Sequence, residues 1–200
     1  MFPGPHLDHS EISDDDEVNA TDVIVEFSKD HYRVNRATVT RIGSGNWVGC
    51  FTKPVTKGIH RLSIKPDKPN VMIGVLDAAE YPKYLTSPMY YSPKAAMMQK
   101  HNGCLVSNQH NIVMNTDHKI LAQNSIPREG QEWSAEADLE KRTLHFFVDG
   151  VQQPHHFIDI PVPLVFAIDT DTKHVPIEIT FWGELTQSHV TFQGTGHNLG

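Results

Sequence analysis

Apolar and polar residues alternate with a period of two along most of this chain, which places the apolar side chains on one face of a β-strand. The clearest case is EWSAEADL, residues 132–139, whose apolar set is Trp133, Ala135, Ala137 and Leu139. Alternation or a short apolar run predicts further strands over 22–27, 37–42, 46–51, 58–65, 71–77, 103–107, 111–114, 143–149, 163–169, 176–182 and 189–193. About a dozen short strands separated by turn residues predict an all-β sandwich.

Two of these segments depart from simple alternation. Residues 71–77, VMIGVLD, are almost continuously apolar, which predicts a strand buried on both faces. Residues 92–100, SPKAAMMQK, favour helix in composition but lack an amphipathic stripe over two turns, so one short turn or another strand is expected there.

The two ends of the chain are expected to lie outside the sandwich. Residues 1–20 are acidic and hold few apolar groups, which predicts a flexible tail. The final GTGHNLG, 194–200, is expected to be a short loose tail for the same reason. The predicted organisation is a tail over 1–20, a single β-sandwich domain over 21–186 and a C-terminal extension over 187–200.

Three carboxylates, Glu136, Asp138 and Glu140, occupy alternate positions on the polar face of the strand at 132–139. Retaining β-glucanases of the jelly-roll type carry acids on alternate strand positions, in the order Glu-x-Asp-x-x-Glu. Here the third acid comes one residue early, and Lys141 and Arg142 follow where such enzymes have aromatic residues for sugars. The pattern therefore favours the solvated side of a β-hairpin over a glycosidase site.

The same hairpin resembles a known family. ADLEKRTLHFFVDGVQQ, residues 137–153, is similar to the signature of SPRY (B30.2-type) domains, with Arg142 in place of the usual turn glycine and His145 in place of the usual serine. Residues 57–65, 71–77, 162–169 and 175–185 resemble further family strands in the expected order, so the resemblance covers roughly 20–186. It implies a concanavalin-like sandwich of two antiparallel sheets, with loops at one edge that bind a partner protein.

Composition narrows the classes of function. The formal net charge of −7 argues against binding to nucleic acid or to an anionic membrane surface. The chain has no apolar run of membrane-spanning length and no secretory signal, so a cytoplasmic location is expected. Its two cysteines, Cys50 and Cys104, are expected to be reduced and buried. Thirteen histidines lack metal-ligand spacing, so neither a metal nor a cofactor is expected.

Two long loops carry the candidate binding residues. Tyrosines in 77–94 offer large contact areas and lose little side-chain entropy on binding. The amides and the histidine in 107–130 can donate and accept hydrogen bonds with a peptide backbone. The alternatives are that the tyrosines pack their loop onto the sheet and that the amide residues form turns. The candidates for partner binding are Trp47, Tyr81, Tyr84, Tyr90, Tyr91, Asn108, His110 and Trp182.

Three hypotheses of function follow from the sequence. The leading one is a non-enzymatic adaptor that binds a partner protein or peptide through its loops. The second is a carbohydrate-binding or glucan-cleaving jelly roll, which requires Glu136 and Glu140 in an open groove beside aromatic rings. The third is a structural subunit of a larger intracellular assembly. The sequence does not identify the partner or the oligomeric state.

Overall fold

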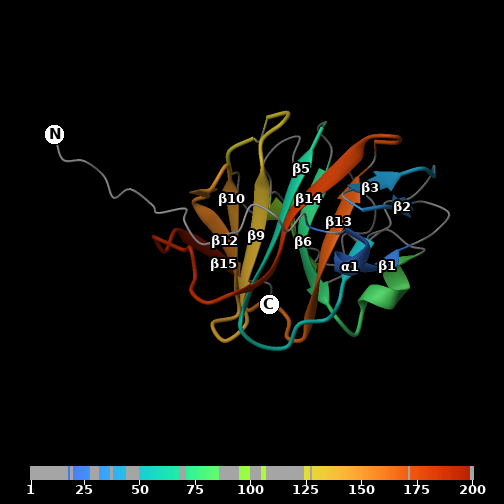
Figure 1. Ribbon diagram of the computed structural model, residues 1–200. Coiled ribbons are helices and arrows are strands. Elements are labelled where there is room, and N and C mark those ends of the chain that lie inside the picture. The colour runs from blue at the N-terminus through green and yellow to red at the C-terminus, as the bar shows by residue number, and fades with distance from the viewer. Residues whose placement is uncertain are drawn as a thin grey trace, which may run out of the picture.

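The computed structural model describes residues 18, 20–27, 32–36, 38–43, 50–67, 71–85, 95–99, 105–106, 124–126, 128–170 and 172–198. Within this part of the chain, two sheets make up almost all of the regular structure (Figure 1). The first is an antiparallel six-stranded sheet, whose order is β1 (Ile24–Phe27), β4 (Cys50–Thr52), β13 (Leu164–Thr170), β6 (Val71–Asp77), β7 (Ala95–Gln99) and β8 (Leu105–Val106).

The second sheet has nine strands. Its order is β15 (Thr195–Asn198), β12 (His155–Ile158), β10 (Thr143–Val148), β9 (Trp133–Asp138), β5 (Ile59–Pro66), β14 (Pro176–Leu185), β3 (Thr38–Arg41) and β2 (Tyr32–Val34), with β11 (Val151–Gln152) paired to β10. Its pairs are antiparallel apart from β12 and β15, which run parallel. Two short helices complete the described part, α1 (Ala20–Val23) and the 3₁₀ helix η1 (Tyr81–Leu85). The predicted all-β sandwich is confirmed.

The main core lies between the two sheets. On β9 the predicted apolar stripe faces inward, and Trp133 is completely buried together with Leu62 of β5 and Phe146 of β10. Burial of a large apolar side chain contributes about 1.5–3 kcal/mol. Strand β6 is buried along its whole length, as its continuous apolar sequence predicts, because a second apolar cluster that includes Met72 and Leu76 forms on the other face of its sheet.

The hairpin between β9 and β10 accommodates the arginine at the position of the family's turn glycine. Arg142 has φ of 55°, a left-handed conformation that glycine adopts most easily. Three contacts to the β12–β13 connection hold it there: the Arg142 Nε donates to the Ile160 carbonyl at 3.0 Å, the Arg142 carbonyl accepts from the Ile160 amide at 3.2 Å, and Nη2 donates to the Asp159 carbonyl at 3.4 Å. These bonds offset the strain that a side chain brings to this turn.

Three expectations about the ends of the chain are wrong. Ala20 is completely buried in α1, with its amide bonded to the Arg36 carbonyl at 2.6 Å, so the folded part already includes residue 20. The predicted strand over 189–193 does not form. Thr195–Asn198, expected to be loose, instead forms β15, because its backbone pairs with the exposed edge of β12. The predicted strand over 111–114 lies outside the described residues.

Cys50 is free and completely buried in β4, as expected, and burial raises the pKa of its thiol well above the ordinary value. Cys104 lies outside the described residues. Neither helix of the described part has the length and apolar character that crossing a bilayer requires.

Candidate functional site

The polar face of β9 is buried, which corrects the expectation of a solvated hairpin. Glu136 is 1% exposed and Asp138 is 5% exposed, whereas Glu140 in the turn remains exposed. The reason is tertiary: residues 186–198, here named the strap, continue from the end of β14 and pass over this face of the sheet (red in Figure 1). Several contacts from the strap to β9, β11 and β12 hold it in place.

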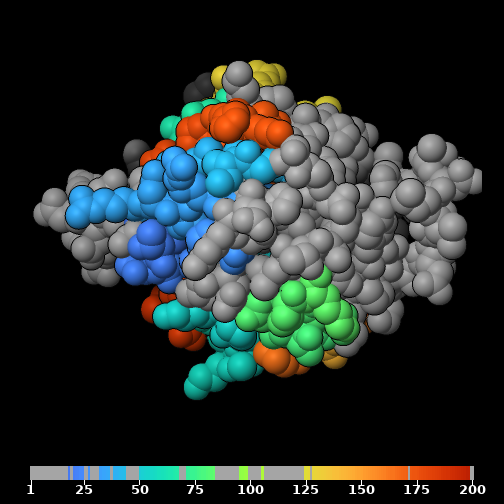
Figure 2. Space-filling model, turned by 90° about the vertical axis from the view of Figure 1, so that its right-hand side faces the viewer, coloured from blue at the N-terminus to red at the C-terminus, as the bar shows by residue number. Residues whose placement is uncertain are grey.

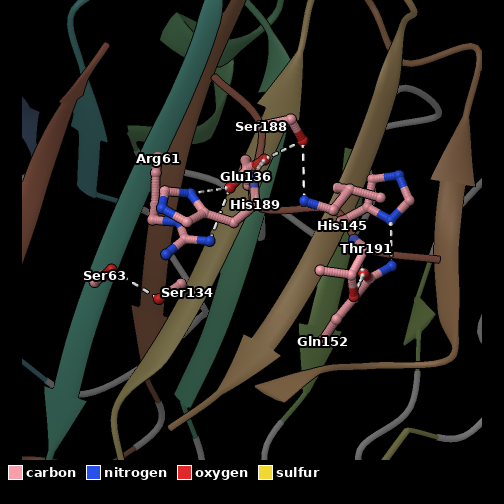
Figure 3. Close-up of polar contacts among 10 residues, drawn as sticks. Arg61, Ser63, Ser134, Glu136, His145, Gln152, Ser188, His189 and Thr191 are labelled. Carbon is pink, nitrogen blue, oxygen red and sulfur yellow. Dashed lines mark hydrogen bonds and ion pairs between the residues drawn. The ribbon is translucent and has the colours of Figure 1, made fainter. Parts of the chain in front are cut away.

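Glu136 is the centre of a polar cluster that lies between β5 and the strap (Figure 3). Its Oε2 accepts a hydrogen bond from Arg61 Nη2 at 2.7 Å, and Arg61 is its register partner on β5. The Oε1 accepts from the Ser188 hydroxyl at 2.7 Å and from the His189 amide at 3.0 Å. The His189 ring Nδ1 lies 3.2 Å from Oε2. Both oxygens of this carboxylate therefore accept hydrogen bonds from other residues of the chain.

Arg61 is held from a second side. Its guanidinium carbon lies 4.4 Å from the ring centroid of Phe147, which is the geometry of a cation–π contact. The ion pair with Glu136 and this aromatic contact fix the arginine against the sheet. Its Nε is buried and has no hydrogen-bond partner, so the cover over this face does not satisfy every polar atom.

Gln152 of β11 forms a second anchor for the strap (Figure 3). Its side-chain carbonyl accepts from the Thr191 amide at 2.7 Å and from the Phe192 amide at 3.3 Å. Its Nε2 donates to the Phe192 carbonyl at 2.7 Å and lies 3.5 Å from the His145 Nδ1. A single amide side chain thus satisfies both donor and acceptor groups of the strap backbone.

Four histidines surround the junction of β10, β12 and β15. The rings of His145 and His156 stack with centroids 4.2 Å apart, and His155 Nδ1 lies 3.2 Å from His197 Nε2. Burial, followed by the neighbouring His156, lowers the pKa of His145 to about 4. Burial also lowers the pKa of His156 and of His197, with smaller contributions from the adjacent imidazoles. Burial and the neighbouring imidazoles thus disfavour the protonated form of His145, His156 and His197.

The other acids of the hairpin have structural roles. The side chain of Asp138 accepts from the Lys141 amide at 3.0 Å and from its ammonium at 2.6 Å. Burial opposes ionisation of Asp138, but the Lys141 hydrogen bonds outweigh that effect and lower its pKa. The Glu140 Oε1 accepts from the Gly58 amide at 2.9 Å, which ties the hairpin to the start of β5.

The described residues do not form the open groove that the glucanase hypothesis requires. Glu136 lies beneath the strap and Glu140 lies on the exposed turn, so the two carboxylates do not flank a common space. Across the described residues, no group of three or more histidine, cysteine or acidic side chains is arranged to hold a metal ion.

Two of the predicted partner-binding side chains can be placed, and they lie on different parts of the sandwich. Tyr81 begins η1 and packs on Phe51, with ring centroids 5.3 Å apart. The residues around η1, green in Figure 2, lie on the same face of the molecule as α1, β2 and β3, in blue. Tyr84 belongs to η1, but only its backbone is described.

Trp182 faces the main core. It meets the Phe166 ring edge-on, with centroids 5.3 Å apart, and lies 6.1 Å from the His60 ring. An irregularity in the pairing of β14 between Ile179 and Phe181 shifts the alternation by one residue, which turns Trp182 inward. The remaining candidates lie outside the described residues: Trp47, Tyr90, Tyr91, Asn108 and His110.

A buried polar link between the two sheets was not anticipated from the sequence. The Tyr32 hydroxyl of β2 donates to Asp169 of β13 at 2.7 Å and accepts from the Thr170 amide at 3.3 Å. Arg41 of β3 lies 3.7 Å from the same carboxylate and also donates to the Thr170 carbonyl. All of these residues are at most 2% exposed. Tyr32 and Arg41 are more than 120 positions away from Asp169 and Thr170 in the chain, so no local pattern indicates the link.

The strap anchors were likewise missed. Arg61 and Glu136 face each other only because β5 pairs with β9, and the strand pairing is a long-range choice. The one local signal was the His-Val-Thr-Phe-Gln run at 189–193, which alternates like a strand and was interpreted as one.

The solved structures that resemble this sandwich include two SPRY domains. The crystal structure of the SPRY domain of human HERC1 matches with a TM-score of 0.54 at 15% identity, and the match covers 76% of this chain and 91% of that one. The TRIM65 PSpry domain matches with a TM-score of 0.59 at 14% identity, over 80% of this chain and 93% of that one. No protein-family profile matches the sequence. No curated protein matches it either. The likeness is one of architecture, and the chain has the fold of SPRY domains.

Proposed function

We propose that this chain is a non-enzymatic protein-interaction module that binds a partner protein or peptide through loops at one edge of its sandwich. The fold supports this proposal, because solved SPRY domains share it and the family that the hairpin resembles is expected to bind partner proteins through loops at one edge of the sandwich. We further propose that the module acts in the cytoplasm, without a metal or cofactor.

The observation that carries the proposal is the anchored start of the loop after β6. Asp77 closes a turn by accepting from the Ala79 amide at 2.8 Å through its side chain and from the Glu80 amide at 3.0 Å through its carbonyl. The Tyr81 ring then packs on the buried Phe51. A loop whose base is fixed loses less conformational entropy when its outer part binds a partner.

In this proposal Tyr81 anchors the loop, and the contact residues come after it. Tyr84, Tyr90 and Tyr91 are the proposed aromatic contacts, because tyrosine is enriched among residues that dominate binding energy. Asn108 and His110 of the second loop, together with Trp47, are proposed as additional contacts. Trp182 is proposed to support the edge from the core side, given its packing on Phe166.

The test starts with capture of partners from cell extract by the full chain, followed by affinity measurement with the purified partner. Replacement of Tyr84, Tyr90 and Tyr91 by alanine is expected to weaken binding at least about tenfold, since two or more binding hot spots are lost. Glu178→Ala, an exposed change on β14 outside both loops, serves as the control and is expected to leave affinity unchanged. Equal affinity of the triple variant and the wild type would contradict the proposal.

A further inference from the structure

The strap is attached to the sheet mainly through side chains of the sheet. Between Thr186 and Gly194 it forms no strand, although it runs across strands β9, β10 and β11 (Figures 1 and 3). Backbone pairing begins only at Thr195, where β15 joins β12. Before Thr195, the strap backbone donates hydrogen bonds to the side chains of Glu136 and Gln152 instead of to a neighbouring strand.

Glu136 and Gln152 bind positions of the strap that are three residues apart. Glu136 contacts residues 188 and 189, whereas Gln152 contacts residues 191 and 192, so the two sets of contacts are three positions apart. The Ser188 hydroxyl and the His189 amide donate to Glu136, whereas the amides of Thr191 and Phe192 both donate to Gln152. Most of these contacts come from the strap backbone and from the hydroxyls of Ser188 and Thr191, not from large side chains, which is the chemistry of extended-peptide recognition.

The strap itself is loosely packed. Most of its residues are exposed, including His189 at 52% and Phe192 at 44%. Most of the buried side chains of this face are polar, among them Glu136, His145 and Gln152, and Phe147 is an apolar exception. Departure of the strap would expose few apolar groups, and water would solvate the polar ones that are uncovered. A segment with few apolar contacts and exposed backbone belongs to the part of a protein that opens most readily.

We propose that this polar face of β5, β9, β10 and β11 is a peptide-binding surface that the chain's own strap occupies in cis. The partner that fits it is an extended protein segment with a serine or threonine hydroxyl and an amide donor for Glu136, and an amide–carbonyl pair for Gln152 three residues later. The strap is the template for that chemistry. This surface is distinct from the loop edge of the proposed function and does not depend on it.

The test uses the full chain and a fluorescent peptide of residues 186–198 as the probe. In a Thr191→Pro chain the strap lacks one of the two amides that donate to Gln152, so the strap should leave the face more often. We expect this chain to bind the wild-type peptide at least about fivefold more tightly than the wild-type chain does, as loss of one internal hydrogen bond implies. Circular dichroism of the Thr191→Pro chain checks that it is folded.

A matched peptide provides the control. A probe that carries Thr191→Pro itself should bind the Thr191→Pro chain at least about fivefold more weakly than the wild-type probe. Equal binding of the two probes, or no preference of the wild-type probe for the Thr191→Pro chain, would overturn the proposal.

Hydrogen exchange of the unmodified chain gives a second measurement that needs no variant. The amides of Thr191 and Phe192 should exchange at least about a hundredfold faster than core amides such as that of Phe146, because they open locally. Exchange of the strap amides only at the rate of global unfolding would also refute a releasable strap.

Discussion

Replacement of Glu136 by glutamine tests the polar cluster beneath the strap with almost no change in side-chain size. The carboxylate accepts bonds on both oxygens, from Arg61 and His189 on one and from Ser188 and His189 on the other. A glutamine has one acceptor oxygen, so in either orientation its NH₂ group must face donors. In both orientations the buried Arg61 loses its counter-charge.

The expected loss of unfolding free energy follows from the burial of Arg61 and Glu136. Arg61 is 13% exposed and Glu136 is 1% exposed, so the pair is largely shielded from water. Removal of one partner from a buried ion pair destabilises a protein by about 3–5 kcal/mol. We expect the free energy of unfolding to fall by about 3 kcal/mol, at the lower end of this range, because Arg61 keeps its contact with the Phe147 ring.

Urea unfolding followed by fluorescence measures this loss in the full chain. With a slope of about 2 kcal/mol per molar urea, the midpoint of the Glu136→Gln variant should fall by about 1.5 M. Glu140→Gln makes the same chemical change at an exposed carboxylate of the same hairpin and should cost less than about 0.5 kcal/mol. A double variant with Arg61→Met should recover part of the loss, since no buried charge remains unpaired.

A loss below about 0.5 kcal/mol in Glu136→Gln would refute the reasoning, because it would mean that the carboxylate is not the charged acceptor at the centre of the cluster. A double variant that is less stable than Glu136→Gln alone would contradict the explanation through the unpaired arginine. The two results therefore address the cluster and its charge separately.

Three further predictions concern other parts of the fold. Tyr32→Phe should lower the free energy of unfolding by about 1–3 kcal/mol in urea titration, because Asp169 loses a buried donor; an unchanged midpoint would contradict the link between the sheets. The pKa of His145 falls from about 6.5 in the unfolded chain to about 4 in the folded one, so the unfolded chain binds the extra proton and stability should fall as pH drops from 6.5 towards 4. His145→Gln should remove up to about 3 kcal/mol of that fall, and identical pH profiles would refute the assignment. Gly194→Ala should speed hydrogen exchange over 195–198 about fivefold or more, because φ is 60° and a Cβ would approach the Pro154 carbonyl oxygen to 2.3 Å; unaltered exchange would show that the approach is tolerated.

Much of the sandwich followed from the sequence because alternation is a local property. The inward stripe of β9 from Trp133 to Ala137 and the doubly buried β6 were both predicted from their patterns, since a period of two fixes which side chains share a face. The order of segments and the hairpin signature also predicted the SPRY-type architecture, which the solved domains confirm at the level of the fold.

The same local pattern led to an error where alternation has more than one structural outcome. The alternating run over 189–193 was interpreted as a strand, but it lies across the sheet and bonds to Glu136 and Gln152. Trp182 faces the core since the pairing of β14 shifts by one residue before it. Neither result can be obtained from a segment alone, because each depends on which distant strand provides the hydrogen bonds.

The sequence by itself determined the class of fold and the two faces of each strand, because these depend on neighbouring residues. Only the tertiary structure decided that the acid at 136 is buried: strand pairing brought Arg61 beside Glu136, and the strap covered this carboxylate. A carboxylate on the polar face of a strand is solvated or enclosed according to what packs over it. That covering segment begins about fifty residues later in the chain, and no local pattern specifies where it lies.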